Sequence, residues 1–152
     1  MVNVFNTDFS EFIIALEKFN VRYILVGGYA VIYHGYNRTT GDLNIWVEPS
    51  LDNYTLLIKA FVDFGLPIFG ITQEKFLNLS EFDVFTFGRP PVCIDILTAV
   101  KGLNFKETYD RSALVKYDEI EVRMIDIRDL ITTKKSVHRL KDLDDLEHLK
   151  TD

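Results

Sequence analysis

Residues 23–30 read YILVGGYA, a short apolar run that stops abruptly at two glycines. A continuous run of β-forming residues without polar alternation predicts a strand over 23–26 that is buried on both faces. The next residues, 29–33, suit a short helix, so Gly27 and Gly28 form a strand-to-helix turn. Bare backbone there lets a phosphate approach main-chain N–H groups beside the positive end of a helix dipole. A tight turn that needs glycine for steric reasons alone is the competing explanation.

The next expected strand, residues 42–47, begins with Asp42-Leu43-Asn44. Residues two apart on a strand face the same side, so Asp42 and Asn44 should present their side chains together, with Leu43 on the opposite face. Mg²⁺ prefers oxygen ligands and is commonly held by one or two carboxylates together with nucleotide phosphates. The pattern therefore predicts a position for a hard metal ion at the beginning of this strand.

A charged residue, Asp95, interrupts the apolar run VCIDIL over residues 92–97. An unpaired buried carboxylate is strongly disfavoured, so Asp95 needs solvent, a cation or hydrogen-bond donors. A strand lying beside residues 42–47 would bring Asp95 to Asp42. Two partners remain open for Asp95, a metal ion and a structural ion pair with a lysine or an arginine.

The remaining elements follow from apolar periodicity and turn residues. Helices are expected over 9–19, capped by Thr7 or Asn6, and over 51–64, 128–137 and 140–149. Two hairpins are expected, one pairing 83–87 with 92–97 and one pairing 113–117 with 121–125 around Asp118-Glu119. Strands interleave with helices while the hairpins exclude a purely parallel sheet, so the expected class is α/β (α+β), a mixed β-sheet flanked by helices.

The length and the composition of the chain limit the number of domains and the classes of function that it can have. A chain of 152 residues that is 47% hydrophobic predicts one domain over 1–152. The net charge of −6 argues against binding of nucleic acid by bulk electrostatics. No stretch approaches the roughly 20 apolar residues of a membrane span, and the single cysteine, Cys93, has no partner for an internal disulfide. A cytoplasmic protein without membrane contact is expected.

Several basic side chains have two open interpretations. Arg38 could contact a phosphate or form an ion pair with Asp42. His34 could contact a phosphate, carry a proton, or hydrogen-bond nearby backbone. The carboxy-terminal basic residues form a local phosphate-binding patch or a solvated helix face; they are Lys134, Lys135, Arg139 and Lys141.

The order of these motifs resembles that of minimal nucleotidyltransferases of the DNA polymerase beta-like superfamily. The motifs are, in order, the double glycine, His34-Gly35, the segment 38–40, the Asp42/Asn44 pair and Asp95. Residues 129–134 (DLITTK) and 139–146 (RLKDLDDL) look like the closing segments of its AbiEii-like and related uncharacterised bacterial members. The resemblance implies the nucleotidyltransferase fold and a nucleoside triphosphate carried by Mg²⁺. It also implies transfer of a nucleoside monophosphate to a hydroxyl group on a small molecule, an RNA or a protein.

The resemblance also assigns roles residue by residue. Asp42 and Asp95 would be the catalytic acids and would bind Mg²⁺, with Asn44 as a weakened third ligand. The nucleotide-contacting residues that it implies are Gly27, Gly28, Arg38, Lys134 and Arg139.

At Asn44 the chain departs from the family pattern, which has aspartate there. An amide oxygen can ligate a hard metal, but one negative charge is missing, and about 1.4 kcal/mol of lost transition-state stabilisation is a tenfold loss in rate. Three accounts stay open: slow or altered transfer, a non-catalytic module that binds a nucleotide or a partner protein, as in a toxin–antitoxin-like pair, and a substitution made to trap the protein. Whether the chain is an enzyme is therefore undecided at this point.

Overall fold

A computed structural model of the chain describes residues 6–36, 40–89, 92–137 and 140–149. Six strands form one sheet in the order β3-β4-β2-β1-β6-β5. They are β1 (Tyr23–Val26), β2 (Asp42–Val47), β3 (Val84–Arg89), β4 (Val92–Leu97), β5 (Ala113–Tyr117) and β6 (Ile120–Met124). The pairs β2/β4 and β1/β6 are parallel, whereas β1/β2, β3/β4 and β5/β6 are antiparallel. The expected mixed sheet is confirmed.

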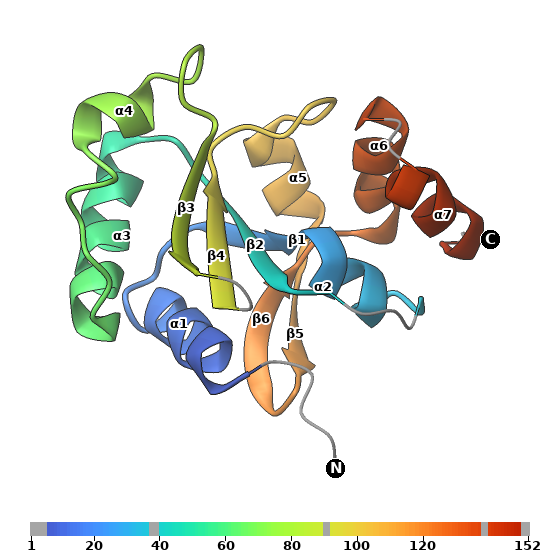
Figure 1. Cartoon of the computed structure of the whole chain (residues 1–152), viewed down its shortest axis with the longest axis horizontal. Coiled ribbons are helices and arrows are strands. Elements are labelled where there is room, and N and C mark those ends of the chain that lie inside the picture. Colours follow the sequence, from blue (N-terminus) through green and yellow to red (C-terminus); the bar gives the residue numbers. More distant parts are fainter. Residues whose placement is uncertain (1–5, 37–39, 90–91, 138–139, 150–152) are drawn as a thin grey trace.

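Helices pack against the strands of the sheet and against one another. They are α1 (Thr7–Lys18), α2 (Gly27–Tyr33), α3 (Leu51–Phe64), α4 (Gln73–Leu77), α5 (Phe105–Arg111), α6 (Ile127–Val137) and α7 (Leu140–His148). Helices α1 and α3 lie side by side at the left of Figure 1, and α6 and α7 lie together at its right, next to α2. Among the described residues, no helix has both the length and the apolar character needed to cross a membrane.

The long helices form where the apolar spacing and the capping residues predict them. Helix α1 buries its apolar face, including Phe12 and Leu16, and Asn6 caps it by accepting a hydrogen bond from the Phe9 amide at 2.9 Å. Helix α3 ends at Gly65, whose φ of +96° is a left-handed conformation that suits glycine. Both helices are therefore confirmed, and Asn6 is the cap of α1.

Two short helices, α4 and α5, were not predicted from the sequence. Helix α4 has five residues and buries only Phe76, and α5 has seven residues and buries Phe105 and Thr108. Elements this short do not repeat an apolar residue often enough to show a helical period. Their N-caps, Thr72 and Asn104, were the available signal, because each side chain accepts a hydrogen bond from the backbone three residues later.

Candidate functional site

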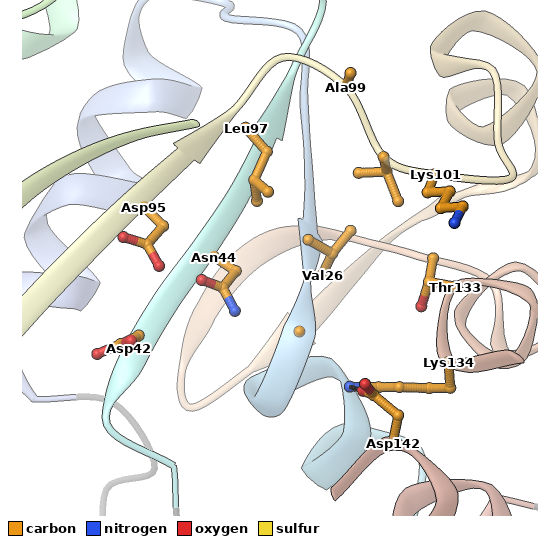
Figure 2. A pocket seen from close by; sticks show the side chains of 12 residues that line it. Val26, Asp42, Asn44, Asp95, Leu97, Ala99, Lys101, Thr133, Lys134 and Asp142 are labelled. Atoms are coloured by element: carbon orange, nitrogen blue, oxygen red, sulfur yellow. Dashed lines mark hydrogen bonds and ion pairs between the residues drawn. The ribbon is translucent and has the colours of Figure 1, made fainter. Parts of the chain in front are cut away.

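A pocket of about 320 Å³ lies between the central strands and the carboxy-terminal helices. Its walls come from the end of β1, from β2, from β4 and the turn after it, and from α6 and α7 (Figure 2). Pockets for small ligands commonly have volumes of about 300–1,000 Å³, so this one is of a suitable size. The lining residues are Val26, Gly27, Asp42, Asn44, Asp95, Leu97, Ala99, Val100, Lys101, Thr133, Lys134 and Asp142.

The sheet register brings the predicted polar residues together at this pocket. Asn44 on β2 lies opposite Asp95 on the parallel strand β4 and opposite Val26 on the antiparallel strand β1. Asp42 lies two residues before Asn44, and the intervening Leu43 is buried. Figure 2 shows the side chains of Asp42, Asn44 and Asp95 beside one another along the two strands.

Asp95 has a hydrogen-bond donor that was not predicted from the sequence. Thr86 lies opposite Asp95 in the β3/β4 hairpin, and its hydroxyl donates to Asp95 Oδ1 at 2.8 Å. Among the described residues, no lysine or arginine forms an ion pair with Asp95, so the structure supplies no support for the structural ion pair. The signal for Thr86 is the hairpin register, which the sequence alone does not fix.

Asp42 and Asp95 together place a negative field at the pocket. Burial raises the pKa of the Cys93 thiol, and the charges of Asp42 and Asp95 raise it further. Burial and the charge of Asp42 likewise raise the pKa of Tyr29. Within the described ranges, no group of three or more histidine, cysteine, aspartate or glutamate side chains could hold a metal ion. A metal at this site would therefore depend on two carboxylates and the Asn44 amide.

The two glycines make different contacts. Gly27 lines the pocket at a φ of +72°, and a Cβ atom placed there would overlap Asn44 Nδ2. Gly28 is buried outside the pocket lining, and a Cβ atom there would overlap Thr40 Oγ1. Both glycines therefore have a steric reason of their own, the close packing against Asn44 and Thr40. The expected turn ahead of the helix is corrected, because α2 already begins at Gly27. Their contact with triphosphate stays a prediction.

The Gly27→Ala variant tests this packing. We expect it to lower the free energy of unfolding by roughly 2–4 kcal/mol, because a left-handed alanine costs about 1–2 kcal/mol and overpacking against Asn44 adds a similar amount. Urea denaturation measures the change. Gly65→Ala is the matched control, since Gly65 has a φ of +96° and no atom within 4 Å of an added Cβ. Equal losses in the two variants would contradict a steric role for the contact with Asn44.

His34 does not line this pocket. Its Nε2–H donates to the backbone carbonyl of Ile125 at 2.7 Å, which ties the end of α2 to the residue after β6. The structure thus favours the backbone hydrogen bond among the roles considered for His34. Arg38 and Arg139 lie outside the described residues, so their contacts with nucleotide stay predictions.

Lys134 is not part of a solvated helix face, and that interpretation of it was wrong. Its side chain lines the pocket but is buried, with 5% of the residue exposed. The ammonium group lies 3.1 Å from Asp142 Oδ1 and 3.0 Å from Asp145 Oδ2, and both aspartates are fully buried. The spacing of two aspartates on one helix face, three residues apart, was the signal for this ion cluster. The contact of Lys134 with a nucleotide stays a prediction.

Comparisons with known proteins agree with the geometry at the level of the fold. No family model matches the chain, and no curated protein sequence matches it. Its structure is similar to the crystal structure of the lincosamide antibiotic adenylyltransferase LnuA with lincomycin bound, with a TM-score of 0.61, 16% sequence identity, and 99% of each chain covered. The chain has the nucleotidyltransferase fold, as the sequence predicts.

Proposed function

We propose that the chain binds a nucleoside triphosphate with Mg²⁺ and transfers the nucleoside monophosphate to a hydroxyl group of an acceptor. The observation that carries this proposal is the placement of Asp42, Asn44 and Asp95 side by side at the pocket of a nucleotidyltransferase fold. Nucleoside triphosphates are present in the cytoplasm, which agrees with the location expected from the sequence.

The donor set fits a hard cation. Two carboxylates and an amide supply oxygen ligands, the class that Mg²⁺ accepts. In Figure 2 the Asn44 amide oxygen lies on the side of Asp95, while its nitrogen lies toward β1. An amide oxygen on the side of a carboxylate is an arrangement in which a cation could contact both groups. When bound, Mg²⁺ would neutralise charge on the triphosphate and polarise its phosphoryl oxygens.

The residues of the chain would then accept the proton of the acceptor hydroxyl and hold the accepting carboxylate in position. The acceptor oxygen forms a bond to the α-phosphorus while the bond from that phosphorus to pyrophosphate breaks. Asp95 accepts the proton of the acceptor hydroxyl. The Thr86 hydroxyl engages Asp95 Oδ1, which leaves Oδ2 for the proton or the metal. The carboxylate is thereby held in one orientation, which general base catalysis requires.

The acceptor class is a small molecule, an RNA or a protein. LnuA is an adenylyltransferase whose structure holds an antibiotic, which makes adenosine triphosphate and small hydroxylated molecules the first combination to test on this chain. The resemblance of residues 129–134 and 139–146 to AbiEii-like members, by contrast, suggests a role in a toxin–antitoxin-like pair with a partner protein.

Replacing Asp95 with alanine should abolish transfer. Loss of a general base reduces turnover by roughly 100-fold to 10,000-fold, and loss of a metal ligand adds to this. Release of pyrophosphate from each nucleoside triphosphate, measured with Mg²⁺ and a panel of hydroxyl acceptors, reports the effect. Asp83→Ala is the control, because Asp83 is an exposed acid just before β3 that does not line the pocket. Undiminished turnover in Asp95→Ala would exclude the assigned role.

A second candidate function follows from Asn44, which stands where the family pattern has aspartate. Among the described residues of β2 and β4, the carboxylates that accompany it at the pocket are those of Asp42 and Asp95, and such a site suits a module that binds a nucleotide without turning it over. Such a module would show Mg²⁺-dependent affinity for a triphosphate and no pyrophosphate release with any acceptor. It would gain release once aspartate replaced Asn44.

A further inference from the structure

Lys101 lies on the wall of the pocket in the turn that follows β4. Figure 2 shows its ammonium group across the pocket from Asp42 and Asp95 and above Thr133. The side chain is exposed, and none of the described residues forms an ion pair with it. The pocket therefore has an acidic end at the strands and a cation at the opposite wall.

The turn that carries Lys101 is closed by a backbone hydrogen bond and packs against α6. The Leu103 amide donates to the Val100 carbonyl at 3.2 Å and closes the turn. Gly102 has a φ of +91°, and a Cβ atom there would lie 2.5 Å from Ser136 Oγ on α6. Glycine thus lets the turn lie directly against α6, beside the pocket wall.

The other polar groups of this wall are already engaged. The Lys134 ammonium bonds two buried aspartates, Asp142 and Asp145. The Thr133 hydroxyl donates its hydrogen to the Leu130 carbonyl at 2.6 Å. Among the described lining residues, Lys101 is therefore the cation whose charge is available to a ligand.

We propose that Lys101 binds the terminal phosphates of a polyphosphate whose metal-bound part lies at Asp42 and Asp95, so that the pocket selects nucleoside triphosphates over monophosphates. This inference rests on the proposed function. A polyphosphate carries negative charge both on its metal-bound part and on its terminal phosphates, so it offers a partner to the cation at the strands and to Lys101 on the opposite wall. A monophosphate satisfies only one of the two ends.

The test is the binding of Mg²⁺ with ATP and of Mg²⁺ with AMP, measured by isothermal titration calorimetry. Lys101→Met keeps the aliphatic stem and removes the charge, whereas Lys101→Arg keeps the charge. We expect Lys101→Met to weaken ATP binding about tenfold or more, the scale of one hydrogen bond to a charged group, and to leave AMP binding unchanged. Lys101→Arg should retain most of the affinity.

Lys106→Met is the matched control, because Lys106 is an exposed lysine on α5 that does not line the pocket. Equal ATP affinity in Lys101→Met and the unmodified protein would overturn this inference alone. Equal weakening in Lys101→Met and Lys106→Met would also overturn it, since bulk charge would explain both. Absence of ATP binding in the unmodified protein would overturn the proposed function instead. Circular dichroism checks that each variant is folded.

Discussion

Lys134→Met is expected to lower the free energy of unfolding by roughly 3 kcal/mol, the scale on which breaking a buried ion pair destabilises a protein. Lys134 supplies a cation that Asp142 and Asp145 share, at 3.1 and 3.0 Å, where all three side chains are buried. Methionine fills a similar volume but leaves the two carboxylates without this cation. Because the ion pairs join α6 to α7, the substitution is expected to weaken the packing of these two helices.

Lys135→Met is the matched control for this prediction. Lys135 is the next residue on α6 and is exposed, so the same change there should stay within about 0.5 kcal/mol. Denaturation in urea, followed by circular dichroism, gives both values. Similar free energies of unfolding for Lys134→Met and Lys135→Met would show that the buried ion cluster does not stabilise the folded protein.

Asn44→Asp is expected to raise Mg²⁺-dependent transfer by tenfold or more, since restoring one preorganised charge at a phosphoryl-transfer site is worth several kcal/mol and about 1.4 kcal/mol is tenfold. Asn44 lies opposite Asp95 and two residues from Asp42, so aspartate there adds a third carboxylate to the same row. Without metal, three neighbouring negative charges repel, and the variant should unfold at a lower temperature than the unmodified protein.

Asn6→Asp is the control that adds the same charge elsewhere. Asn6 is the exposed N-cap of α1, where aspartate caps as well as asparagine does. Pyrophosphate release and thermal unfolding, each with and without Mg²⁺, compare the two variants. A rate in Asn44→Asp no higher than in Asn6→Asp would show that the missing carboxylate does not limit the site.

The strands and long helices were predictable because their signals are local. The apolar run at residues 23–26 predicted the first and the last residue of β1. The alternation over Asp42-Leu43-Asn44 correctly placed Leu43 on the buried face of β2 and Asp42 on the other face. Gly65 marked the end of α3. Each of these features depends on neighbours in sequence, which periodicity and capping rules describe.

The contacts of the site depended on pairing that the sequence does not fix. Thr86 meets Asp95 because of the hairpin register, and the turn that carries Lys101 lies against α6 at Gly102. Hydrophobicity alone does not give burial at every position, since the large apolar side chain of Phe69 is 83% exposed. The burial of Lys134 likewise follows from how α6 meets α7, which its charge does not reveal.

Thermal stability with each nucleoside triphosphate, in the presence and absence of Mg²⁺, tests most directly whether the pocket binds a metal-bound triphosphate. A ligand at 100 times its dissociation constant stabilises the folded state by about 2.7 kcal/mol, which raises the midpoint by roughly 5–10 °C for a chain of this size. The proposal predicts such a rise for at least one triphosphate, dependent on Mg²⁺ and absent in Asp42→Ala. No rise with any triphosphate, in the unmodified protein and in Asn44→Asp alike, would contradict it.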